Sequence, residues 1–135
     1  MPGQPAPRAV FVYGTLMRGQ CRERSWPRRP LSIEPAWTLG RLYDLGHYPA
    51  LVEGTDRIAG ELWNFAAEDI GETLRVLDRI ECYCQRTDDL YRRLLIECTT
   101  VAGDLASAFT YCYARPLPDG ARIVAANASG HCEWP

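Results

Sequence analysis

The segment at residues 9–13 constrains the fold most, because its pattern is that of a buried strand that stops abruptly at a glycine. The four residues before Gly14 favour extended backbone: Val10, Phe11, Val12 and Tyr13. A strand that ends at glycine allows bare backbone N–H groups to face a bound anion or a carbonyl oxygen. Many strands also end at glycine for turn geometry alone, so a second feature is needed to mark a site.

Two further strands are predicted in the first half of the chain. Residues 36–44 alternate roughly between apolar and polar side chains, with an interruption at Gly40. Residues 45–51 contain glycine and proline and predict a turn that returns to extended chain. A second strand is predicted at 58–63, where Gly60 marks a bulge or a close approach of another backbone.

One amphipathic helix is predicted from about Ala67 to about Tyr83. Its apolar residues recur at spacings that place them on one face: Ile70, Leu74, Leu77 and Ile80. This stripe predicts that one side of the helix packs against the sheet.

Two more strands are predicted after the helix, at 91–98 and 107–113, and Gly103 fits the turn between them. The element order is mostly strand with one inserted helix, which indicates the α+β class rather than a doubly wound sheet. We expect residues 1–8 to form a disordered lead-in and residues 9–135 to form a single domain.

Composition excludes several classes of function. The net charge of −2 gives no reason to expect a nucleic-acid partner, and no apolar run approaches the length of a membrane span. All 15 basic residues are arginine, which excludes lysine Schiff-base chemistry and a P-loop lysine. The N-terminus lacks the apolar core of a signal peptide, so we expect a cytoplasmic protein with six reduced cysteines.

Glu81 is the candidate catalytic residue. It follows Leu77 by four positions and therefore shares the buried face of the helix. Burial would raise the pKa of its carboxyl toward that of a working general base. The alternative is a helix-end glutamate paired with an arginine. Asp78 is expected to be structural, bonded to a loop backbone or to an arginine.

Two other groups of residues suggest different sites. Cys82, Cys84, His131 and Cys132 could be imagined around a metal, but Cys-x-Cys is not the usual spacing for structural zinc, and we predict no metal. Four arginines between residues 20 and 30 could attract an anionic substrate, although a solvated charged segment is the favoured interpretation. They are Arg22, Arg24, Arg28 and Arg29.

Five motifs occur in order across roughly residues 10–115. They are Tyr13-Gly14-Thr15-Leu16 with Gly19, Leu42-Tyr43-Asp44-Leu45-Gly46-x-Tyr48-Pro49-Ala50, Gly60-Glu61-Leu62, Leu77-Asp78-x-x-Glu81 and Tyr91-x-Arg93. Together they resemble the gamma-glutamylcyclotransferase-like superfamily, specifically its AIG2-like branch. The resemblance implies a small mixed β-barrel with a flanking helix and a cavity lined by the Tyr-Gly-Thr-Leu loop.

The resemblance also implies roles for individual residues. Glu81 would be the catalytic acid and base, and Tyr91 would close the pocket. Backbone amides of the loop would hold the γ-glutamyl group; the loop residues are Tyr13, Gly14, Thr15 and Leu16. Residues 82–90 separate Glu81 from the Tyr-x-Arg motif by more than is usual in such proteins, which predicts a longer rim loop that tunes specificity.

The function implied is conversion of a γ-glutamyl amine or peptide to 5-oxoproline and a free amine, without a cofactor or metal. The partner would be a small-molecule γ-glutamyl substrate, with no nucleic acid and no membrane. The alternative is a binding or regulatory protein that keeps the fold and pocket without turnover. The group beyond the γ-carbonyl and the oligomeric state stay open.

Overall fold

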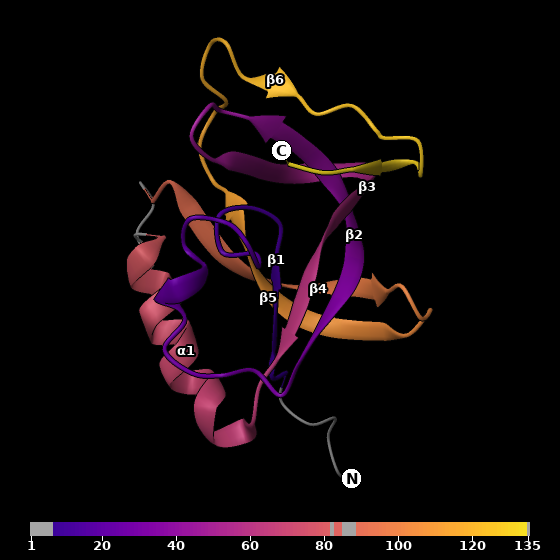
Figure 1. The fold of residues 1–135 in the computed structure, drawn as a ribbon. Helices are drawn as coiled ribbons and strands as arrows, with labels where there is room; N and C mark the ends of the chain where they lie inside the picture. The colour runs from indigo at the N-terminus through magenta and orange to yellow at the C-terminus, as the bar shows by residue number, and fades with distance from the viewer. Residues whose placement is uncertain (1–6, 82, 85–88, 135) are drawn as a thin grey trace, which may run out of the picture.

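A computed structural model describes residues 7–81, 83–84 and 89–134 of the chain. Figure 1 shows strongly curved strands with one helix lying along their side. The strands are β1 (Ala9–Val12), β2 (Ser32–Asp44), β3 (Pro49–Asn64), β4 (Tyr91–Thr100), β5 (Leu105–Tyr113), β6 (Arg122–Ile123) and β7 (His131–Cys132). The helix is α1 (Ala67–Ile80), and a short 3₁₀ turn, η1 (Glu23–Ser25), follows the first loop.

Five of the strands close into a barrel. They are hydrogen-bonded in the order β2, β4, β5, β1, β3, and β3 pairs with β2 to complete the ring. β1 runs parallel to β5, whereas the other pairings of the ring are antiparallel. The short strands β6 and β7 extend the sheet beside β2 and β3. The predicted α+β class, a small mixed β-barrel with one main helix, is confirmed.

Strand β1 is buried on both of its faces. Successive side chains of a strand point to opposite sides; Phe11 packs in the barrel interior, whereas Val10 and Val12 pack in a second cluster with the helix. Val10, Phe11 and Val12 are 0%, 1% and 4% exposed. This double burial explains why the segment is an unbroken apolar run rather than an alternating one.

Helix α1 covers the outer side of β1 through the predicted apolar stripe. Leu77 is fully buried, and Ile70, Leu74 and Ile80 pack around the same cluster. The helix ends at Ile80, three residues before the predicted end, because the chain leaves through a wider turn in which Tyr83 N donates to Asp78 O at 2.7 Å. Within the described part of the chain, no helix is long and apolar enough to cross a membrane.

The β2–β3 hairpin is longer than the sequence pattern predicted. The predicted interruption at Gly40 is confirmed by a register shift between Gly40 and Arg41. β3 begins at Pro49, well before the predicted start at residue 58. Residues 53–57 alternate between exposed and partly buried positions, and no apolar pattern marks them as strand. They belong to the strand because their segment pairs with β2 through its backbone, and such pairing leaves no apolar pattern in the sequence.

Gly60 occupies a close approach between two backbones, as predicted. A Cβ added there would lie 2.3 Å from Val12 O and 2.7 Å from the Phe11 ring, which leaves no room for a side chain. Glycine at this position is therefore required for β3 to pair with β1.

The first prediction concerns stability. Gly60→Ala should destabilise the fold by about 1–3 kcal/mol, because the new methyl group forces β1 and β3 apart. Gly71→Ala is the matched control, since Gly71 is an exposed helical residue and a methyl group added to it would meet no other atom within 4 Å. It should stabilise the fold by about 0.5–1 kcal/mol. Urea unfolding of both variants measures the two effects, and a change of the same sign in both would contradict the steric explanation.

Candidate active site

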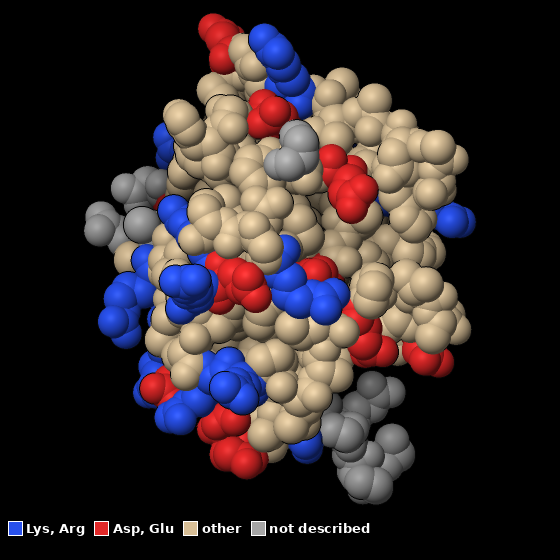
Figure 2. Space-filling model, in the orientation of Figure 1, with Lys and Arg blue, Asp and Glu red and all other residues tan. Residues whose placement is uncertain are grey.

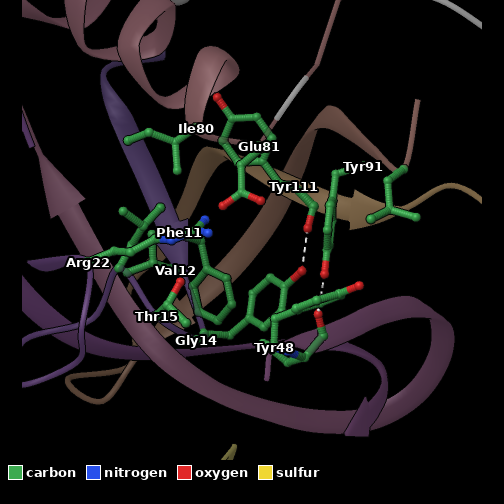
Figure 3. Close-up of a pocket in the computed structure, with 14 residues that line it drawn as sticks. Phe11, Val12, Gly14, Thr15, Arg22, Tyr48, Ile80, Glu81, Tyr91 and Tyr111 are labelled. Carbon is green, nitrogen blue, oxygen red and sulfur yellow. Dashed lines mark hydrogen bonds between the residues drawn. The ribbon is translucent and has the colours of Figure 1, made fainter. Parts of the chain in front are cut away.

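A pocket of about 220 Å³ lies where the end of β1, the end of α1 and the start of β4 meet. It contains all six predicted site residues: Tyr13, Gly14, Thr15, Leu16, Glu81 and Tyr91. Figure 3 shows the Glu81 carboxylate and the aromatic rings directed into the same space. Its other lining residues are Phe11, Val12, Arg22, Tyr48, Pro49, Ile80, Leu90 and Tyr111.

The loop after β1 uses its carbonyl groups to hold its own shape. Gly14 O accepts from Met17 N at 3.1 Å, and Thr15 O accepts from Arg22 N at 2.8 Å. Leu16 O accepts from the Trp26 indole N–H at 2.9 Å. Each of the three carbonyl groups is therefore bonded to a later part of the same loop.

The N–H groups at the start of the same loop differ from its carbonyl groups in this respect. Among the described residues, no hydrogen-bond partner is found for the N–H groups of Gly14, Thr15 and Leu16. A Cβ on Gly14 would lie 2.6 Å from Pro49 Cγ, so only glycine allows the loop to pass this close to the start of β3. Three consecutive donors at a pocket wall are suited to an oxyanion or a carbonyl oxygen.

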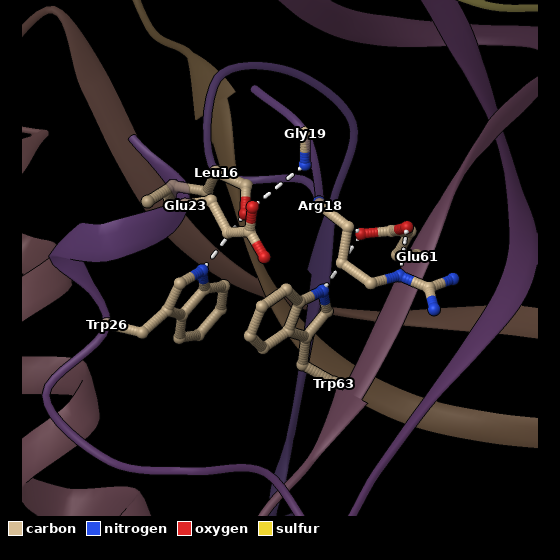
Figure 4. Close-up of polar contacts among 7 residues, drawn as sticks. All are labelled: Leu16, Arg18, Gly19, Glu23, Trp26, Glu61 and Trp63. Atoms are coloured by element: carbon tan, nitrogen blue, oxygen red, sulfur yellow. Dashed lines mark hydrogen bonds and ion pairs between the residues drawn. The ribbon is translucent and has the colours of Figure 1, made fainter. Parts of the chain in front are cut away.

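Glu61 anchors the far side of the loop to β3. Its carboxylate accepts from Arg18 N and pairs with Arg18 Nε at 2.9 Å, and it also accepts from the Trp63 indole N–H at 3.1 Å. The Trp63 ring stacks on Trp26, with centroids 4.1 Å apart (Figure 4). Glu61, the glutamate of the Gly-Glu-Leu motif, therefore holds the loop against β3 and does not line the pocket.

Glu81 stands directly after the last residue of α1. Its own N–H still donates to Leu77 O at 2.9 Å, so the helix fixes the position of its backbone. The side chain is partly buried, and this desolvation raises the pKa of the Glu81 carboxyl; the nearby Arg22 charge opposes the shift. The predicted burial beside Leu77 is confirmed, and the raised pKa suits a group that both takes and gives a proton.

Tyrosines form much of the pocket wall. The Tyr13 hydroxyl donates to Tyr111 O, and the Tyr91 hydroxyl donates to Pro49 O at 2.7 Å. Burial raises the pKa of both phenols, so they stay protonated and keep these bonds. Tyr91 also contacts Tyr48 edge to face, with ring centroids 6.1 Å apart. These rings shape the pocket, and the hydroxyl protons of Tyr13 and Tyr91 are already engaged.

Asp78 ties the helix to the barrel. It pairs with Arg93 Nη1 at 2.6 Å and accepts from the Tyr111 hydroxyl at 2.5 Å. Since Arg93 belongs to β4 and Tyr111 to β5, this cluster fixes the end of α1 that carries Glu81. The predicted bond between Asp78 and an arginine is confirmed.

The four arginines of the arginine-rich segment are exposed, as expected of a solvated run, but Arg22 departs from this interpretation because it also lines the pocket. Arg28 does lie at the surface, where it pairs with Glu72 at 2.5 Å, and basic and acidic side chains are interspersed on the face shown in Figure 2. Arg22 instead lines the pocket, with its guanidinium directed toward Glu81 (Figure 3). No periodic pattern could reveal this, because the bond from Arg22 N to Thr15 O turns the chain back.

The other predicted features fall outside the pocket or only partly within the described residues. In the described ranges, no group of three His, Cys, Asp or Glu side chains is placed to hold a metal. Cys82 lies outside those ranges, as do residues 1–6 of the expected lead-in and residues 85–88 of the expected rim loop. Leu90, at the end of that loop, lines the pocket. Cys84 is exposed and Cys132 lies in β7.

Fold and site together define a small α+β barrel protein with a pocket at one end of its helix. Residues 10–133 match the family described as gamma-glutamyl cyclotransferase, AIG2-like. The chain therefore belongs to this family, as the sequence resemblance predicted.

Individual relatives agree with this assignment. The gamma-L-glutamyl-butirosin B gamma-glutamyl cyclotransferase of Niallia circulans is 34% identical over 110 residues, which cover 78% of this chain and 67% of that protein. The gamma-glutamylcyclotransferase family protein YtfP of Escherichia coli K12 is 31% identical over 115 residues, covering 85% and 89%. The crystal structure of an AIG2-like protein from Mus musculus has the same fold, with a TM-score of 0.66 at 23% identity over 83% of this chain and 80% of that one.

The second prediction is that Glu81→Gln gains stability relative to the natural protein as pH rises. A carboxyl with a raised folded-state pKa favours folding while protonated, and this contribution is lost as pH rises from its ordinary pKa of 4.5 through the raised value. Glutamine has no such dependence. Urea midpoints measured between about pH 4 and about pH 8 should diverge in favour of the variant.

Glu68→Gln is the matched control for this prediction. Glu68 is exposed in the first turn of α1, where the helix dipole favours a negative charge. Its replacement should therefore lower stability at neutral pH. If Glu81→Gln instead becomes less stable than the natural protein as pH rises, the carboxylate of Glu81 is not desolvated in the folded protein.

Proposed function

We propose that this protein is a gamma-glutamyl cyclotransferase that converts a γ-glutamyl amine or peptide to 5-oxoproline and a free amine. The proposal depends on one observation: N–H groups of the loop that have no hydrogen-bond partner among the described residues line the same pocket as a partly buried carboxylate. The name of the Niallia circulans relative, which describes a γ-glutamyl compound as its substrate, supports the same class of chemistry.

The substrate contains its own nucleophile, the α-amine, which can close a five-membered ring on the γ-carbonyl carbon. Because the attack is intramolecular, holding the substrate in a folded conformer supplies much of the catalysis. No metal, cofactor or covalent enzyme intermediate is needed for this step. The enzyme must hold the γ-carbonyl and manage the protons.

Glu81 would manage the protons as general acid and base. It takes one proton from the α-ammonium, and the free amine then attacks the γ-carbonyl carbon. The carbonyl oxygen becomes an oxyanion, for which the N–H groups of Gly14, Thr15 and Leu16 are the available donors. As the C–N bond to the leaving group breaks, the two protons lost from the α-nitrogen end on the departing amine, and the oxyanion returns to a carbonyl.

The size of the pocket supports an amino-acid-sized group. Pockets for drug-sized ligands enclose about 300–1,000 Å³, and this one encloses about 220 Å³. The γ-glutamyl part would fill it, and the leaving amine would pass the half-exposed side chains of Tyr48 and Leu90, which are 40% and 37% exposed. The leaving amine would therefore be recognised at the rim rather than inside the pocket.

The third prediction tests the activity directly. Purified protein should release 5-oxoproline from at least one member of a panel of γ-glutamyl amines, γ-glutamyl dipeptides and glutathione. Glu81→Gln should lower kcat by roughly 10²–10⁴-fold, the usual contribution of a positioned general acid–base group. Glu68→Gln, at the opposite end of the same helix, should keep the activity of the natural protein.

The panel also separates catalysis from binding alone. If no compound is turned over while calorimetry still detects binding of γ-glutamyl compounds, the protein is a binding protein that keeps the family's pocket. Turnover that survives Glu81→Gln would instead remove Glu81 from the mechanism.

A further inference from the structure

We propose that Arg22 binds the α-carboxylate of the γ-glutamyl group and makes the site specific for substrates in which that carboxylate is free. This inference rests on the proposed function, because it assigns a part of the substrate to a residue of the same pocket. It goes beyond that function by naming the group that the enzyme requires at the α-carbon.

The charges of the pocket wall match those of an amino acid. Among the described residues that line the pocket, Arg22 carries the one positive charge, and Glu81 carries the one negative charge. An α-carbon that carries both an ammonium and a carboxylate is complementary to two such charges side by side. If Glu81 faces the ammonium whose proton it removes, the carboxylate on the same carbon comes within reach of Arg22.

Three hydroxyl groups of the pocket are already engaged. The Tyr13 and Tyr91 hydroxyls donate to main-chain carbonyls, and the Tyr111 hydroxyl donates to Asp78. These groups are therefore not free to hold an anion. The loop N–H groups are needed at the γ-carbonyl, so among the described lining residues Arg22 is left as the charged donor for the carboxylate.

The backbone of Arg22 is held in place at the pocket mouth. Its N–H donates to Thr15 O at 2.8 Å, and its carbonyl accepts from Ser25 N at 3.0 Å. It is thus fixed to the substrate-binding loop at one end and to η1 at the other. The guanidinium points toward the Glu81 carboxylate in Figure 3, although the residue as a whole is exposed.

The charge of Arg22 also acts on the groups inside the pocket. It lowers the pKa of Glu81 and of Tyr91, against the larger effect of burial in both. The charge is therefore felt within the pocket rather than being screened in bulk water. Arg28 and Arg18 differ from Arg22 in this respect, because each pairs with a glutamate outside the pocket.

The fourth prediction compares two substrates that differ only at the α-carbon. The first is the best γ-glutamyl substrate of the panel, and the second is its α-carboxamide, in which a neutral amide replaces the carboxylate. Arg22→Ala should lower kcat/KM for the first roughly 10–100-fold, the range expected for a hydrogen-bonded charge pair. It should change kcat/KM for the carboxamide by less than about threefold.

The comparison of two substrates isolates binding of the carboxylate. Removing Arg22 also changes the pKa of Glu81, but that change affects both substrates alike and cancels in the ratio. Arg22→Lys should recover part of the discrimination, since it keeps the charge and loses the two-pronged geometry. Arg24→Ala removes the same charge two residues later, outside the pocket lining, and should leave the ratio unchanged.

Equal losses for both substrates in Arg22→Ala would overturn the proposal. A direct binding measurement keeps the test independent of turnover: calorimetry with 5-oxoproline and with 2-pyrrolidone, the same lactam without a carboxylate. Binding of 5-oxoproline that depends on Arg22, with 2-pyrrolidone indifferent to it, supports the role of Arg22 even in a protein without cyclotransferase activity. Binding of 5-oxoproline that is unchanged in Arg22→Ala, or undetectable in the natural protein, overturns it.

Discussion

The burial of β1 on both faces is the constraint on which the rest of the structure depends. Phe11 fills the barrel while Val10 and Val12 lie beneath α1, so one short strand joins the two hydrophobic clusters. Its pairing with β3 on one side and β5 on the other also closes the ring. Since the strand ends between the two clusters, the loop that follows it must emerge beside the end of the helix, where the pocket lies.

The carbonyl groups and the N–H groups of that loop differ in their hydrogen bonding. The carbonyls of Gly14, Thr15 and Leu16 are bonded within the loop, whereas their N–H groups have no partner among the described residues. Backbone donors near a protein interior are normally paired, and leaving them open costs stability. Such local departures from complete pairing are expected where a protein binds a ligand.

Burial and the charge of Arg22 have opposite effects on the pKa of Glu81. Burial raises the pKa of Glu81, and the C-terminal end of α1 is also an unfavourable place for a negative charge. Arg22 offsets part of this cost without removing it. A carboxylate held between these influences is better suited to take and give a proton than a fully solvated glutamate or a tightly paired one.

The sequence by itself determined the main strands, the helix and the barrel class, and it predicted six of the residues that line the pocket. The apolar run before Gly14, the stripe that ends at Leu77 and the close approach at Gly60 are local patterns with direct physical causes, and the motif order carried the family and Glu81. Tertiary structure alone decided the early end of α1, the full length of β3 and the position of Arg22. Arg22 lies in a charged segment with no periodic pattern, and only the return of the chain to Thr15 directs it into the pocket. Apolar periodicity within a helix or strand shows which side chains are buried. Contacts between loop residues depend on the course of the whole chain, which is fixed only when the barrel is assembled.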